Sequence, residues 1–201
     1  MLGATSWFRS TWWLPLSLMA ACSVVPERAD PTSPPVVAQV LGKALRANGA
    51  GEMQHLILRE LTDRYAAEHG IVVSQAEVDT YVARQREVLA ADPNVRLTPD
   101  SPEDAATREQ VARARLLQLK IDGALQRQYG GRVAARTGGA VPVDAYRRFL
   151  EEQAAQGRFR IFDVAGERAF WRAWSDDTRW QFLPEGSEAA ARAFDPAPSP
   201  R

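Results

Sequence analysis

Cysteine and histidine are scarce in this chain of 201 residues, which contains Cys22, His55 and His69 as its only residues of these two types. A single cysteine excludes a disulfide within the chain, because that bond needs two thiols. The two histidines fall in one predicted helix and would lie about 21 Å apart along its axis, at ~1.5 Å per residue. Because this separation is too long for a shared ion, we predict no metal site.

An excess of charge of one sign is also lacking, because 25 basic residues balance 25 acidic ones. Without a basic surplus, the composition does not indicate nucleic-acid binding. The chain has neither His-Glu-x-x-His nor Gly-x-Ser-x-Gly, nor the glycine patterns that bind phosphates and dinucleotides, so we predict no cofactor and no catalytic residue. The alternative is glycan chemistry by Asp163, Asp176 and Asp177 beside Trp174 and Trp180. Such acids more often lie in solvated turns or at helix starts.

A hydrophobic run long enough to cross a membrane is missing from the N-terminus, where the apolar segment covers only residues 11–21. A transmembrane helix needs ~20 apolar residues. Arg9 precedes an apolar stretch over 12–18, and small residues precede Cys22, which is the pattern of a cleaved secretory signal. The sequence therefore predicts a signal peptide over residues 1–21.

The end of this signal, Met19-Ala-Ala-Cys22, resembles a bacterial lipobox, although leucine is the commonest residue where this chain has Met19. The resemblance implies that Cys22 is lipidated and becomes the new N-terminus. Ser23 stands where an aspartate would indicate retention at the inner membrane, so the resemblance implies a lipid anchor in the outer membrane, on its periplasmic face. A secreted protein without lipid is the alternative. Residues 22–35 contain four prolines and few apolar side chains, which predicts a disordered tether.

The body of the chain, residues 36–194, is rich in alanine, arginine, glutamate, glutamine and leucine, which favour helix. Ser74 and Glu77 predict a capping box, in which each side chain binds a backbone N–H of the other. Ser101 followed by Pro102 predicts a second capped helix start. Together with the spacing of apolar residues, these signals predict four helices in the first half of the body, over residues 36–47, 52–69, 74–92 and 102–129.

The segments Leu56–Leu61 and Ala66–Asp79, with the junction Gly70-Ile-Val-Val-Ser74-Gln-Ala-Glu77, resemble the N-terminal chaperone domain of the SurA/parvulin-type periplasmic foldases. The resemblance covers about residues 36–131 and implies a multi-helix orthogonal bundle that holds unfolded or extended polypeptide. Family members often carry a prolyl-isomerase domain. The chain after Gly131 is too short for that domain and lacks its sequence motifs, so we expect no isomerase activity. The alternative is an unrelated helical bundle with the same helix-start pattern.

Residues 132–194 are predicted to form a small aromatic-rich α(+β) subdomain, followed by a disordered tail over 195–201. The segment 130–139 contains four glycines together with Arg132 and Arg136. Glycine pairs are typical of a bent linker or a short hairpin, and the alternative is a cradle of backbone N–H groups and arginines for an anion. Beyond it the pattern predicts a helix, an extended segment, a helix with an aromatic face and a short terminal helix, over residues 142–157, 159–164, 170–174 and 185–194.

Seven aromatic side chains between residues 159 and 182 predict a core for this subdomain. The alternative is an aromatic groove that binds peptide or glycan. The candidate residues for peptide binding are Tyr65, Tyr81, Trp171 and Trp174. Taken together, these observations predict a mostly α, lipid-anchored, chaperone-like protein that binds unfolded or extended polypeptide. The alternative is a structural or assembly-partner lipoprotein that binds one folded envelope protein.

Overall fold

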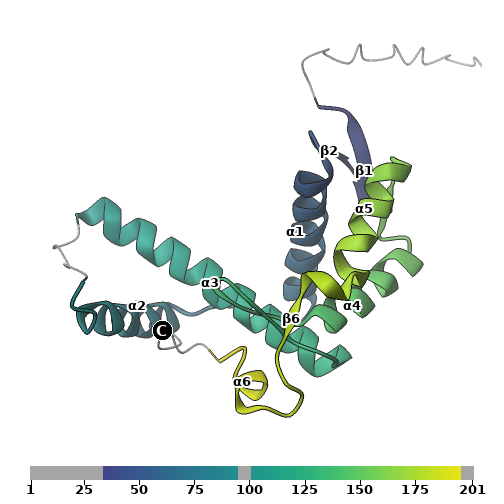
Figure 1. The fold of residues 1–201 in the computed structure, drawn as a ribbon. Coiled ribbons are helices and arrows are strands. Elements are labelled where there is room, and N and C mark those ends of the chain that lie inside the picture. Colours follow the sequence, from purple (N-terminus) through teal and green to yellow (C-terminus); the bar gives the residue numbers. More distant parts are fainter. Residues whose placement is uncertain (1–33, 95–100, 196–201) are drawn as a thin grey trace, which may run out of the picture. The chain divides into compact units, whose positions relative to one another are not determined.

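The computed structural model describes residues 34–94 and 101–195, which form a mostly helical fold with two small antiparallel sheets (Figure 1). The mostly α prediction is therefore confirmed. In chain order the elements are β1 (Val36–Val40), β2 (Lys43–Arg46), α1 (Ala50–Glu68), α2 (Gln75–Ala90), α3 (Pro102–Tyr129), β3 (Ala134–Arg136), β4 (Gly139–Val141), α4 (Val143–Ala155), β5 (Phe159–Ile161), α5 (Val164–Ser175), the 3-10 helix η1 (Asp177–Arg179), β6 (Gln181–Phe182) and α6 (Glu188–Ala191).

The helix predicted over residues 36–47 is wrong, because this segment is the β1–β2 hairpin. Leu41 and Gly42 join the strands with φ of 49° and 80°. Two successive positive φ angles are typical of a two-residue hairpin turn and cannot be continued as a right-handed helix. A third strand, β5, pairs with the other edge of β1 and places Ile161 opposite Ala38.

The starts of α2 and α3 confirm the predicted capping. Ser74 Oγ accepts a hydrogen bond from the backbone N–H of Glu77 at 3.3 Å, and the backbone N–H of Ser74 donates to Glu77 Oε2 at 2.9 Å. Ser101 and Asp104 form the same reciprocal pair at the start of α3, with Pro102 in the first turn. Each box satisfies backbone donors that have no partner within the helix, and this fixes where α2 and α3 begin.

The main core lies between the β2-β1-β5 sheet and four helices, α1, the C-terminal half of α3, α4 and α5. Its largest fully buried side chains include Ile57, Leu125, Phe149 and Phe170. Burial of a side chain of this kind contributes about 1.5–3 kcal/mol to folding. These four residues come from both sides of residue 131, so the two halves of the body share this core.

A second and smaller core lies between α2 and the N-terminal half of α3. It consists of Val78, Tyr81, Ala112 and Leu116, with Val73 and Val82 packed against it. The long helix α3 therefore belongs to two cores, the small one at Ala112 and Leu116 and the main one at Ile121 and Leu125. We call α2 together with residues 102–116 of α3 the helical arm.

The second sheet has the strand order β4-β3-β6. Its β3–β4 hairpin turns at Thr137 and Gly138, the latter with φ of 89°, and Gly139 is already paired with Arg136 in β4. This part of the glycine-rich connection is therefore a short hairpin, as predicted. β6 pairs with β3 and sets Phe182 opposite Ala134. After residue 141, the two predicted helices and the extended segment between them are observed as α4, α5 and β5. The last helix, α6, is shorter than the helix predicted over residues 185–194.

Candidate functional site

An open pocket of about 450 Å³ lies where the segment between α1 and α2 passes over α3. Gly70 ends α1 with φ of 60°, a left-handed conformation that favours glycine. The turn is held by a hydrogen bond from the Ile71 N–H to the carbonyl of Ala66 at 2.9 Å. It leaves the side chain of Val72 73% exposed. The pocket is lined by Gly70, Ile71, Val72, Leu119, Lys120, Gly123 and Arg127.

Two cations stand in this otherwise apolar lining. Lys120 Nζ donates to the carbonyl of Val72 at 2.7 Å and pairs with Glu77 Oε1 at 2.6 Å. The hydrogen bonds from Lys120 and then from Ser74 lower the pKa of Glu77 to about 2, so this carboxylate stays ionised and holds the lysine at the pocket. Arg127 also lines the pocket, two turns of α3 further on. The lining can therefore accept an apolar side chain together with a carboxylate or a backbone carbonyl.

The helical arm adjoins the pocket and exposes apolar side chains. Val111 on α3 is 62% exposed, and Val88 and Leu89 near the end of α2 are also exposed. Val88 and Leu89 belong to the apolar stripe of α2. Nearer the start of this helix, at Tyr81, the same stripe packs on α3. Beyond Val82 the small core ends, and at Val88 and Leu89 the stripe is solvent-exposed surface. Exposed apolar groups of this kind on a helical hairpin are typical of surfaces that bind other chains.

The four residues predicted for peptide binding are not brought together. Tyr65 and Trp174 lie in the main core and Tyr81 in the core of the arm, each at most 9% exposed. Trp171 is partly buried, with its ring edge-on to Phe170 at 5.2 Å. As placed, these side chains serve packing, and they offer little surface to a bound polypeptide.

The hydrogen bonds and stacking of these aromatics show the same role. Tyr65 Oη donates to Gln128 Oε1 at 2.8 Å, and burial raises the pKa of its hydroxyl. Trp174 stacks between Tyr146 at 5.2 Å and Trp180 at 6.0 Å. His69, predicted to interact with the end of its helix, places Nδ1 2.8 Å from the carbonyl of Tyr65.

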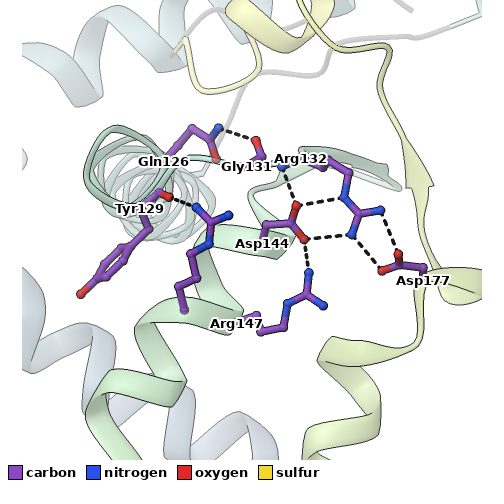
Figure 2. A network of polar contacts seen from close by, with 8 residues as sticks. Gln126, Tyr129, Gly131, Arg132, Asp144, Arg147 and Asp177 are labelled. Carbon is purple, nitrogen blue, oxygen red and sulfur yellow. Dashed lines mark hydrogen bonds and ion pairs between the residues drawn. The ribbon is translucent and has the colours of Figure 1, made fainter.

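Arg132 joins three segments of the C-terminal half (Figure 2). Its backbone N–H and its Nε each donate to Asp144 Oδ2 at 2.9 Å, and its Nη1 donates to Asp177 at 2.8 Å. Arg147 pairs with Asp144 from the same helix. The two arginines lower the pKa of Asp144 to about 2, and the hydrogen bond from Arg132 is the largest cause. The guanidinium of Arg132 also lies 4.1 Å from the ring centre of Phe182. The network thus fixes the start of α4 against η1 and the β3 sheet.

The aspartates considered for glycan chemistry occupy helix starts. Asp163 accepts hydrogen bonds from the backbone N–H groups of Ala165 and Gly166 as the N-cap of α5. Asp176 accepts from the hydroxyl of Thr178 at 2.6 Å, and this bond lowers its pKa. A lowered pKa is opposite to what a general acid needs. Asp177 is paired with Arg132.

One carboxyl is almost completely buried. Asp122 on α3 is 3% exposed and accepts hydrogen bonds from Tyr146 Oη at 2.7 Å and Gln118 Nε2 at 2.8 Å. Burial raises its pKa to about 6 in spite of these two bonds. Tyr146 stacks on Trp174, so this polar cluster lies inside the packing of α3, α4 and α5.

Cys22 and the tether up to residue 33 lie outside the described residues, as does the tail beyond Asp195. Among residues 34–94 and 101–195, no helix is long and apolar enough to cross a bilayer. The same ranges contain no cluster of three or more metal-ligating side chains. No known protein family, curated protein or solved structure matches the chain. Its function is therefore inferred from the residues themselves.

Proposed function

We propose that this chain is a lipid-anchored envelope protein that binds unfolded or extended polypeptide and has no isomerase activity. The observation that carries the proposal is the pocket beside the arm, where apolar groups of Ile71, Val72 and Leu119 stand next to the cations Lys120 and Arg127. An unfolded chain offers the matching groups, namely apolar side chains next to unpaired backbone carbonyls and acidic residues.

The helical arm supports the same function because its own core is small. Only Val78, Tyr81, Ala112 and Leu116 are buried in it, so most of its length is not held by packing. An element with few buried contacts opens locally at lower cost than the main core does. The arm can therefore adjust to clients of different sequence, with Val88, Leu89 and Val111 as contact points.

The test is suppression of aggregation of a urea-unfolded outer-membrane protein on dilution, followed by light scattering. Wild-type protein at several-fold excess is expected to suppress the scattering. Val72→Glu and Val111→Glu are expected to lose most of this effect, because a carboxylate replaces an exposed apolar contact. The matched control is Ala169→Glu, which adds the same charge to an exposed position on α5.

If all three variants keep the thermal midpoint of the wild type, unfolding is excluded as the cause of any lost suppression. Equal suppression by Val72→Glu, Val111→Glu and wild type would contradict the proposed surface. Failure of the wild type itself, together with one stoichiometric partner recovered from solubilised envelope, would favour the assembly-partner alternative.

The lipid anchor has a test of its own. Mass spectrometry of protein purified from the envelope is expected to show a chain that begins at Cys22 and carries fatty acids. A chain that begins at Met1 without lipid would refute the anchor and leave the polypeptide-binding test standing.

A further inference from the structure

The sheet β2-β1-β5 has one face in the main core and one face turned outward. Ala38, Val40 and Leu45 point into the core, as alternate residues of a strand do. Residues of the opposite face follow from the strand register, in which Gln39 is paired with Ala44 on one side and Arg160 on the other. The register shifts between Val36 and Ala38, so that Val36 is paired with Arg46 and not with a core-facing residue. We call Val36, Gln39, Ala44, Arg46, Arg160 and Phe162 the outer face.

This outer face is cationic and partly apolar. All six side chains are exposed, and they include two arginines and no carboxylate. Phe162, whose backbone N–H donates to Val37 at 2.9 Å, is 50% exposed, and Val164 just beyond it is 67% exposed. The acid between them, Asp163, is engaged with the backbone N–H groups at the start of α5. A large exposed aromatic beside arginines is an arrangement that suits the interface of an anionic bilayer.

Pro34, where the described chain begins, lies beside this face. Arg46 Nη1 donates to the carbonyl of Pro34 at 2.7 Å, so the first described residue is fixed next to β2. Twelve positions separate Cys22 from Pro34 (34 − 22). At ~3.5 Å for each residue, even a fully extended tether spans only about 40 Å. A lipidated Cys22 therefore keeps the outer face close to the membrane at all times, which raises its effective concentration there.

From this geometry we infer that the outer face lies on the surface of a bilayer that contains anionic phospholipid. Arg46 and Arg160 bind headgroup phosphates, and Phe162 with Val164 enters the interface between headgroups and acyl chains. The inference rests on the proposed lipid anchor and goes beyond it, because an anchored protein can also hang from its tether without touching the bilayer. Contact at this face would fix the orientation of the protein relative to the membrane.

The test uses the full lipidated chain in vesicles. A thioether at Cys22 leaves no thiol in the wild type, so Phe162→Cys provides a single site for the environment-sensitive dye NBD. In vesicles of phosphatidylethanolamine and phosphatidylglycerol, the dye at position 162 is expected to shift to the blue and to be quenched by spin-labelled lipid. The matched control is Val111→Cys, an exposed valine of the helical arm, where the dye is expected to stay in water.

The role of charge is tested in two ways. Arg46→Gln and Arg160→Gln are added to the labelled protein, or the vesicles are made of neutral phosphatidylcholine. Each change is expected to reduce the quenching of the dye several-fold. Val164→Cys is the second probe if the first variant does not keep the circular dichroism of the wild type. Labels at positions 162 and 111 with equal, water-like spectra on protein that floats with the vesicles would overturn the inference and leave the anchor intact. A blue shift that needs added envelope protein would also overturn it, in favour of a protein partner. Protein that does not float with vesicles would refute the anchor and the inference with it.

Discussion

Asp122 offers the sharpest test of the packing, because its carboxyl is buried and, among the described residues, its hydrogen bonds come from the neutral groups of Tyr146 and Gln118. Tyr146 and Gln118 donate to it, and these bonds only partly replace water. Asp122→Asn removes the charge while it keeps an oxygen that accepts from Tyr146. The substitution therefore isolates the free energy of burying the charge.

The magnitude follows from the shift in pKa. The carboxyl has a pKa of about 6 in the folded protein, against 3.8 for an unperturbed aspartate. Because the folded value is raised, the protonated group favours the folded state, and this stability is lost as pH rises from 3.8 through 6. Between about pH 4.5 and pH 7, the free energy of unfolding of the wild type should fall by about 2 kcal/mol relative to Asp122→Asn.

The assay is urea unfolding of both proteins across this pH range, followed by tryptophan fluorescence, to which Trp174 contributes through its contact with Tyr146. Carboxylates with lowered pKa, such as Asp144, destabilise the fold as pH falls, but they are common to both proteins and cancel in the difference. A difference that stays constant within about 0.5 kcal/mol across the range would refute this account of Asp122.

Three further predictions concern local structure, each measured as the free energy of unfolding in urea. Asp144→Ala should cost about 2–3 kcal/mol, because it removes the acceptor of the arginine network; a cost near zero would show that the network does not stabilise α4. Gly131→Ala should cost about 1–3 kcal/mol, because φ is 96° and the new Cβ would stand 2.4 Å from Asp144. Gly138→Ala, with φ of 89° and open space, should cost less, and the reverse order would contradict the steric argument. Ser74→Ala should cost about 1 kcal/mol by removing the capping box with Glu77, and no loss would mean that α2 starts without it.

The helices could be predicted from the sequence because their signals are local. Ser74 with Glu77, and Ser101 with Pro102, mark helix starts within four residues, and Gly70 and Gly130 mark helix ends. Capping depends on hydrogen bonds between near neighbours, so it needs no knowledge of the rest of the fold.

The β1–β2 hairpin could not be predicted in this way. Its apolar residues Val37, Val40, Leu41 and Leu45 have the spacing of a helical face, and periodicity alone does not separate the two structures in so short a run. The stretch is a strand because β5 pairs with it, and β5 lies more than a hundred residues further on. The local hint was the density of β-branched valine in residues 36–40.

The candidate site was missed for a similar reason. Lys120 and Arg127 face residues 70–72 only because α3 passes beneath the start of α2, and no motif in the sequence records that crossing. The aromatic residues that are prominent in the sequence are instead buried in the core, as Tyr65 and Trp174 show. Large aromatics gain most from burial, so prominence in a sequence favours the core over the surface.

The pairing of β1 with β5 has a consequence for the order in which the protein can fold during synthesis. The first strand to leave the ribosome has no partner on one edge until residues 159–161 have been made. A two-stranded hairpin is marginally stable in water, so the nascent N-terminal half has no finished sheet to settle into. The β2-β1-β5 sheet therefore cannot be completed before residue 161 has been translated, whereas the core of the helical arm needs no residue beyond Leu116.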